Sequence, residues 1–278
     1  MASLEGDVAR HYTTGAITER ILAALESLGV EIASARPEDL KPVDEFHTGG
    51  MEATLALLEQ LDITPKTDVL DIGSGIGGTA RALAARYGCR VTGIDLTEEF
   101  VDAARALTAM VGLGDRASFR LGSALALPVP DAGFDLAFLL HVGMNIADKP
   151  GLFAEARRAL RPGGTFAIFE VMKRGPDPLD FPLPWSTAPE TSFVDLPETY
   201  RAAAEAAGFE LVSQRDRTDF ARDFFARVSA MIAERGGPPP LGIHLLMGDT
   251  APQKIANAFA CLESGRTAPT EMIFRVPT

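Results

Sequence analysis

The chain has 278 residues, of which 46% are hydrophobic and 23% charged, and its formal net charge is −12 at pH 7. This apolar content suffices for a full core and excludes a disordered chain, and the length fits one large domain or two small ones. The negative charge argues against a nucleic-acid partner, because it repels a phosphate backbone.

The first 62 residues are expected to form an N-terminal helical cap. Charged residues interrupt the first thirty positions, so we expect neither a signal peptide nor a membrane span, and a cytoplasmic protein. The stretch "DVARHYTTGAITERILAALESLGV" is typical of a capping helix. Tyr12 and, further on, His47 are candidates for closing over a bound ligand, although both residue types often serve packing alone.

The stretch "VLDIGSGIGGTARALA" (69–84) predicts a strand over 67–72, a tight turn, and a helix over 78–87. Glycines at 73, 75 and 77 allow positive φ and let a ligand lie against the backbone, while the helix N-terminus offers free N–H groups. NAD sites and S-adenosylmethionine sites both use this arrangement. The turn alone therefore does not identify the ligand.

Strands and helices alternate after this turn. We expect strands over 89–95, 117–121, 134–140, 164–171 and 209–217, and helices over 97–111 and 149–160. Such alternation favours a parallel sheet with helices on both faces, whose ligands bind at the carboxyl ends of the strands.

Asp95 ends the second predicted strand, where a carboxylate can accept hydrogen bonds from a ribose diol; a helix N-cap is the alternative. A short-chain dehydrogenase would also need Tyr and Lys four residues apart. The three tyrosines are followed four positions later by Ala16, Val91 and Ala204, so that pair is absent from the sequence.

Four segments, in this order, carry a family resemblance: "VLDIGSGIGGTARALA", "VTGIDLTEEFVDAA", "ALALPVPDAGFDLAF" and "EARRALRPGGTFAI". They resemble the successive motifs of class I S-adenosylmethionine-dependent methyltransferases, most closely the small-molecule branch with sarcosine/dimethylglycine, ubiquinone-biosynthesis and sugar O-methyltransferases. The resemblance is dense from about 45 to 172. It implies an α/β, Rossmann-like seven-stranded sheet, mostly parallel with the last strand antiparallel, plus helical caps.

The resemblance also implies cofactor contacts. Asp71 and the backbone of Gly73, Gly75 and Gly77 would hold the methionine end, Asp95 the ribose, and Leu96 the adenine. Ser123 and Ala124 occupy the place where the family usually has an acidic residue and a small one to read the adenine amino edge. Ser123 departs from that pattern and offers a weaker acceptor.

Candidates for catalysis follow the fourth and fifth predicted strands. His141 could be the general base or only touch the cofactor; Asn145 could bind substrate or organise its own loop. Glu170 ends an apolar strand, where an unpaired structural carboxylate would be costly, so we expect it to hold the acceptor. Met144 is expected to contact substrate. The four histidines lack metal-ligand spacing, and we predict no metal site.

The remaining segments are expected to complete one methyltransferase domain over 1–278. Its core would span 63–218 with a lid insertion at about 173–195, followed by a second helical cap over 219–268 and a final strand over 269–278. Phe181 and Trp185 in the lid and His244 in the second cap are candidates for the acceptor pocket, although the single Trp could simply pack the lid onto the core.

These observations predict a methyltransferase that uses S-adenosylmethionine to methylate O or N of a small polar metabolite in a covered cleft. Two alternatives stay open: an NAD(P)-dependent oxidoreductase, and a non-catalytic protein that binds S-adenosylmethionine. We expect a small-molecule acceptor, no nucleic-acid or membrane partner, and a monomer or homodimer.

Overall fold

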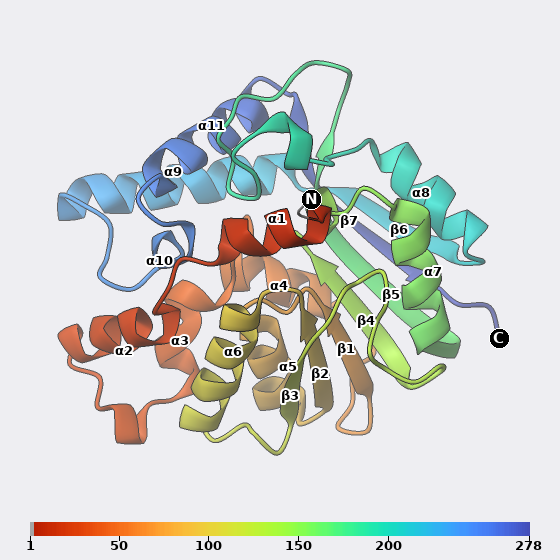
Figure 1. The fold of residues 1–278 in the computed structure, drawn as a ribbon, viewed down its shortest axis with the longest axis horizontal. Helices are drawn as coiled ribbons and strands as arrows, with labels where there is room; N and C mark the ends of the chain where they lie inside the picture. Colours follow the sequence, from red (N-terminus) through yellow and green to blue (C-terminus); the bar gives the residue numbers. More distant parts are fainter. Residues whose placement is uncertain (1–2) are drawn as a thin grey trace.

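The computed structural model describes residues 3–278, which form a seven-stranded sheet with helices on both faces (Figure 1). The strands are β1 (Asp68–Ile72), β2 (Arg90–Asp95), β3 (Ala117–Leu121), β4 (Phe134–Leu140), β5 (Leu160–Lys173), β6 (Glu210–Asp216) and β7 (Thr267–Arg275). Their spatial order is β3-β2-β1-β4-β5-β7-β6. The first five pair in parallel, and β7 runs antiparallel to both β5 and β6, which confirms the predicted fold class.

Alternate residues of each central strand supply two separate cores. In β4, Leu136 and Phe138 pack on the face covered by α4 (Gly50–Leu58) and α5 (Gly78–Tyr87), whereas Ala137 and Leu139 pack on the face covered by α7 (Lys149–Ala159) and α8 (Pro197–Ala206). This follows from the two-residue period of a strand. Because both faces are covered, the central strands read as continuous apolar runs.

The chain reverses sharply after β1. Gly73 has φ of +75°, and a Cβ built there would lie 2.2 Å from the Val142 side chain, so only glycine fits between β1 and the loop after β4. The adjoining α5 begins at Gly78, where a Cβ would lie 2.1 Å from the Asp44 carbonyl oxygen. The glycine turn is therefore packed against both the β4 loop and the N-terminal segment.

The N-terminal segment contains two helices where the sequence predicted one: α1 (Leu4–Tyr12) and α2 (Ile17–Ser27). The break has a structural cause in α6 (Glu98–Met110). The Glu99 carboxylate accepts hydrogen bonds from the N–H groups of Thr14, Gly15 and Ile17 at 2.9, 3.0 and 3.0 Å, and so satisfies free donors at the start of α2. A short η1 (Ile32–Ser34) and α3 (Pro37–Asp44) follow.

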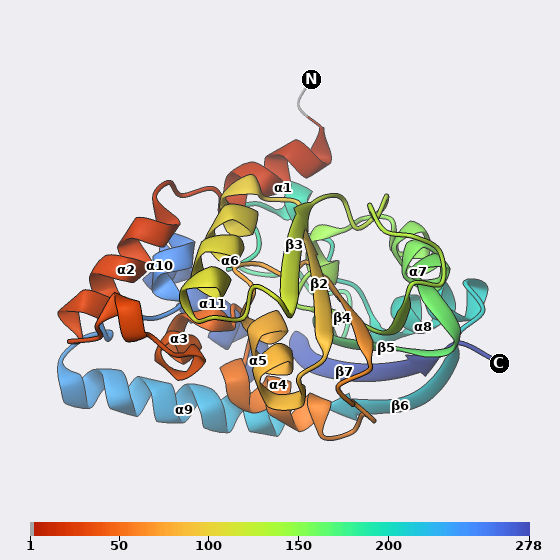
Figure 2. The same cartoon turned by 90° about the horizontal axis from the view of Figure 1, so that it is seen from below.

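Before it forms β7, the C-terminal segment lies at the same end of the sheet as the N-terminal segment (Figures 1 and 2). It consists of α9 (Thr218–Arg235), the one-turn α10 (His244–Met247) and α11 (Ala251–Glu263). The stretch between β5 and α8 has little regular structure beyond η3 (Pro189–Thr191). Over residues 3–278, no helix combines the length and apolar character needed to cross a membrane.

Candidate functional site

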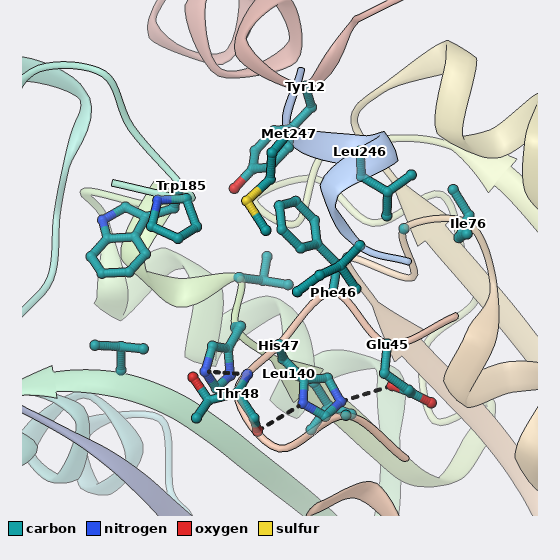
Figure 3. A pocket seen from close by; sticks show the side chains of 18 of the residues that line it. Tyr12, Glu45, Phe46, His47, Thr48, Ile76, Leu140, Trp185, Leu246 and Met247 are labelled. Carbon is teal, nitrogen blue, oxygen red and sulfur yellow. Dashed lines mark hydrogen bonds and ion pairs between the residues drawn. The ribbon is translucent and has the colours of Figure 1, made fainter. Parts of the chain in front are cut away.

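A cavity of about 750 Å³ lies at the carboxyl ends of the central strands (Figure 3). The predicted site residues that line it are Tyr12, His47, Asp71, Gly73, Gly75, Asp95, Leu96, Ser123, Ala124, His141, Met144, Asn145, Trp185 and His244. Three others do not reach its wall: Gly77, Glu170 and Phe181. Residues from both terminal segments complete the wall, so the cavity joins parts of the chain that are distant in sequence.

Asp71 places a carboxylate without a partner in this wall. Its side chain is 2% exposed, and its Oδ2 atom has no hydrogen-bond partner among residues 3–278. Burial, reinforced by the nearby carboxylates of Glu45 and Asp95, raises the pKa of Asp71 to about 8. A buried carboxyl group without a partner is suited to pair with a cationic group of a ligand, which would supply the missing partner.

Asp95 has a different environment, since both of its carboxylate oxygens are held. Oδ1 accepts from the Thr97 N–H and Oδ2 from the Gly75 N–H, each at 2.8 Å. Burial raises the pKa of Asp95, and these backbone hydrogen bonds oppose the shift. The carboxylate thus ties the glycine turn to the end of β2, and its oxygens keep lone pairs for a ligand at the cavity wall.

A buried polar cluster links the N-terminal segment to α5. His47 Nε2 lies 2.7 Å from Glu45 Oε2 and 2.9 Å from Thr54 Oγ1, and the Thr79 hydroxyl donates to the same Glu45 oxygen at 3.0 Å (Figure 3 shows the His47–Glu45 contact). The other Glu45 oxygen is buried and has no partner among the described residues. His47 therefore orients Glu45 beside Asp71.

His141 follows β4 with a left-handed backbone, φ being 56°. Its Nδ1 lies 3.0 Å from the Phe169 carbonyl oxygen, which requires a proton on Nδ1, and the Thr48 N–H points at Nε2 at 3.4 Å. Burial and the neighbouring His47 lower the pKa of His141 well below its usual value. The geometry thus favours a neutral imidazole with both nitrogens engaged.

Tyr12 and Asn145 meet across the cavity. The Asn145 Nδ2 donates to the Tyr12 hydroxyl at 2.9 Å, so α1 is connected to η2 (Gly143–Asn145) of the β4 loop. Asn145 Oδ1 is buried and has no partner in the described part of the chain. The Tyr12 ring also packs near Phe46, and Met247 of α10 lies beside it (Figure 3).

Glu170 lies behind the β4 loop rather than on the cavity wall. It is fully buried, and its Oε1 accepts a hydrogen bond from the Val142 N–H at 3.0 Å. Burial raises the pKa of Glu170 to about 7. A Cβ on Gly143 would lie 3.2 Å from this carboxyl group, which shows how closely the loop covers it. The position does not let Glu170 touch a ligand in the cavity.

Ser123 does line the cavity, but its hydroxyl is already engaged. It hydrogen-bonds to the Glu5 carboxylate of α1 and accepts from the Leu125 N–H at 3.0 Å. Glu5 also lines the cavity. A carboxylate therefore reaches the place where the sequence has Ser, although it comes from a segment 118 residues away.

The cavity wall also contains polar residues that were not predicted to line it, among them Glu5, Glu45, Thr48, Ser74 and Thr79. Ser74 and Thr79 belong to the quoted stretch 69–84, whereas Glu5, Glu45 and Thr48 belong to none of the four quoted segments and reach the cavity only through the fold. Trp185, in contrast, occupies the wall as predicted, with its Nε1 donating to Ser192 Oγ at 2.9 Å. Among residues 3–278, no group of three or more His, Cys, Asp or Glu side chains could hold a metal ion.

Residues 70–168 match a family model described as a methyltransferase domain. Methyltransferase GfsG of Streptomyces halstedii is 32% identical over 192 residues, which cover 66% of this chain and 67% of that protein. For several further curated relatives, the chain spans less than half of their length. The residues matched by the family model include the glycine turn and extend from β1 into β5.

Solved structures share the fold at low sequence identity. A putative sarcosine dimethylglycine methyltransferase from Galdieria sulphuraria has a TM-score of 0.67 and 20% identity, covering 82% of this chain and 85% of its own. A phosphoethanolamine N-methyltransferase 2 of Haemonchus contortus, in complex with S-adenosylhomocysteine, has a TM-score of 0.73 and 19% identity, covering 100% and 61%. Together with the match to GfsG, these findings show that the chain belongs to the class I S-adenosylmethionine-dependent methyltransferases.

Proposed function

We propose that this enzyme transfers the methyl group of S-adenosylmethionine to O or N of a small molecule in the cavity, beneath two helical caps. The observation that carries the proposal is the buried, partnerless Asp71 carboxylate beside the glycine turn. Within a single methyltransferase domain, the caps would be the segments 1–62 and 219–268, and the lid would be 173–195.

The residues at the glycine turn fit the cofactor. Asp71, assisted by the free oxygen of Glu45, would pair with the ammonium group, and the backbone of Gly73 and Gly75 would lie against the methionine end. Asp95 would accept from the ribose hydroxyls. Gly77 would act only through the turn itself, because a Cβ there would lie 2.6 Å from Phe119 rather than facing the cavity.

The adenine end would be read by Leu96, Ala124 and the Ser123–Glu5 pair. The Glu5 carboxylate offers the strong acceptor that Ser123 alone lacks. Since Glu5 belongs to α1, cofactor binding would also fix the position of the N-terminal cap, which carries Tyr12 into the same cavity.

The bound cofactor supplies an activated methyl group, so the protein must align the acceptor and exclude water. Tyr12 and Asn145 close one side of the cavity through their hydrogen bond, while Trp185 and Met144 supply apolar wall. The unpartnered Asn145 Oδ1 is suited to accept a hydrogen bond from the acceptor.

For a hydroxyl acceptor, His244 is a better proton acceptor than His141. Both His141 nitrogens are engaged by backbone groups, whereas His244 has no hydrogen bond with any residue in 3–278 and lines the cavity. Burial lowers the pKa of His244, which leaves it neutral and able to take a proton at pH 7. His141 would instead shape the wall beside the cofactor.

Glu170 would serve as a positioning residue rather than a catalytic one. Its carboxyl group anchors the Val142 N–H, and the adjoining residues carry His141 and Asn145 into the cavity. This assignment explains why an acidic group is tolerated at a fully buried site: its hydrogen bond orients a loop.

Calorimetric titration of S-adenosylhomocysteine at pH 6.5, in two buffers of different ionisation enthalpy, tests the proposal. Asp71, with its pKa near 8, is protonated before binding, and an ammonium partner lowers that pKa. The ligand α-amino group arrives protonated, because the pKa of a free amino acid's ammonium lies above the roughly 7.7–8.0 of a peptide α-amino group. We therefore expect release of close to one proton, and an affinity that rises with pH towards 8.

Asp71→Asn should abolish this proton release and weaken binding by about 1.5–3 kcal/mol, the scale for a hydrogen bond to a charged group. Asp68→Asn is the matched control, because Asp68 pairs with Arg90 and Arg161 at the other end of β1. Equal proton release by the wild type, Asp71→Asn and Asp68→Asn would show that Asp71 does not contact the ligand. Absence of binding to the wild type would contradict the proposed cofactor site as a whole.

A further inference from the structure

The cavity extends from the cofactor residues to a wall built by α9, α10 and α11, and this wall indicates the class of acceptor. On α9, the residues that line the cavity include Phe224, Phe225, Val228, Met231 and Ile232, which recur at helical spacing along one face. An amphipathic helix in a globular protein normally buries such a face in the core.

In α9 that face is only half-buried by the protein. Its only buried residues are Thr218 and Ala221 in the first turns, and Met231 is 36% exposed. The five apolar residues belong to no hydrophobic cluster among the described residues, although Phe225 approaches Phe259 of α11 with ring centroids 5.3 Å apart. The apolar face therefore lacks a partner of matching size among residues 3–278.

The apolar surface of the cavity wall continues beyond α9. The cavity is also lined by Pro238, Pro239 and Ile243, which precede α10, and by Ile255, Ala258 and Leu262 of α11. Trp185, 5% exposed, joins them from the lid. These segments present an apolar surface that is continuous with the proposed cofactor site.

The charges that line the cavity disfavour an anionic ligand. Its acidic residues in the described chain are Glu5, Asp44, Glu45, Glu52, Asp71, Asp95 and Asp148, whereas Lys41 is the sole lysine or arginine there, and it is exposed. Arg227, the nearest candidate cation on α9, pairs with Glu52 and is not part of the wall. A phosphate or carboxylate on the acceptor would thus find no lysine or arginine partner in the described wall other than the exposed Lys41.

We infer that the methyl acceptor is a lipophilic molecule without anionic groups, whose apolar body packs against the α9–α11 wall and whose single nucleophilic O or N points to the cofactor. This inference rests on the proposed function and specifies its substrate class. It departs from the small polar metabolite expected from the sequence, because the free surface of the cavity is mostly aliphatic and aromatic. Burial of the α9 face by the acceptor would supply the binding energy.

Trp185 is the single Trp of the chain and lies in the cavity wall, so its fluorescence reports on ligands there. With the protein saturated by S-adenosylhomocysteine, 1-octanol should change the emission saturably. Octyl phosphate, which has the same chain, should need at least roughly tenfold higher concentration. Phosphoethanolamine, which has the anion without the chain, should leave the emission unchanged.

Two variants of α9 locate the effect. Val228→Asp should weaken octanol binding at least tenfold, whereas Ala226→Asp, at an exposed position of the same helix outside the cavity wall, should not change it. Calorimetry with S-adenosylhomocysteine should give wild-type affinity for both, which shows that they are folded and that the cofactor site is intact.

The inference is overturned if octyl phosphate or phosphoethanolamine binds more tightly than octanol, or if Val228→Asp binds octanol like the wild type. Either result with normal S-adenosylhomocysteine binding would leave the proposed cofactor site standing. Loss of S-adenosylhomocysteine binding by the wild type would instead contradict the proposed function itself.

Discussion

At the scale of single residues, some polar groups of the cavity wall already have hydrogen-bond partners, whereas others have none among residues 3–278. His141 has backbone partners on both ring nitrogens, and both carboxylate oxygens of Asp95 accept from backbone N–H groups. Asp71 and Asn145 each keep a buried oxygen without a partner in residues 3–278. Because an unmet buried polar atom costs about 1–3 kcal/mol, these free atoms are the places where a ligand gains most.

The protonation of the histidines tests this distinction between partnered and unpartnered groups, and the test does not require the methyl acceptor. Long-range nitrogen–proton NMR spectra resolve imidazole tautomers, and four histidines are present in the chain. We expect His141 to stay neutral, with its proton on Nδ1, at pH values where a free imidazole is already protonated, because burial lowers its pKa well below the usual value of about 6.5. His244 should begin to protonate at higher pH than His141.

His141→Gln and His244→Gln assign the two signals. A His141 that titrates near neutrality, or that carries its proton on Nε2, would restore it as a general-base candidate and remove the reason for preferring His244.

At the scale of elements, the predictions that succeeded depend on local patterns. The strand–turn–helix around Gly73 follows from an apolar run and a glycine cluster, and the family, the cofactor and the antiparallel last strand were all predicted correctly. The NAD(P)-dependent alternative was wrong, as the family match shows. The roles assigned to single site residues stay predictions, since no comparison tests them.

Other features could not be predicted because distant contacts produce them. One helix was expected at residues 7–30, but Glu99 of α6 satisfies the N–H groups that start α2 and so permits the break. Phe181 was expected in the pocket, yet it packs with the apolar cluster around Leu183 instead. The helical spacing of apolar residues in α9 does not show whether that face packs against a core or lines a cavity.

Glu99→Ala tests how firmly α1 and α2 depend on α6. Three N–H groups lose their acceptor, so hydrogen exchange over residues 4–17 should accelerate, and affinity for S-adenosylhomocysteine should fall because Glu5 and Tyr12 lose their fixed position. By analogy with a lost N-cap, we expect a loss of about 0.5–2 kcal/mol in the free energy of unfolding. Glu98→Ala, the exposed neighbour, is the control; equal exchange in the two variants would contradict the assigned role of Glu99.

At the scale of the whole molecule, helices from the N-terminal and C-terminal segments meet over the carboxyl ends of the central strands. Both segments line the cavity that begins at the glycine turn: the N-terminal segment with α1 and α3, and the C-terminal segment with α9 to α11. In the proposed function, the carboxyl ends of the strands would supply most of the cofactor contacts, and the caps would supply much of the wall for the acceptor. This division agrees with the rule that ligands of parallel α/β sheets bind at the carboxyl ends of the strands.

Transfer of a labelled methyl group tests the central claim most directly. A metabolite extract of the organism that encodes the chain is divided into a neutral lipophilic fraction and an anionic water-soluble fraction, and each is incubated with the enzyme and methyl-labelled S-adenosylmethionine. We expect label in organic-extractable products of the first fraction, at a rate that Asp71→Asn reduces. Label transferred only to the anionic fraction, or at equal rates by both proteins, would contradict the account.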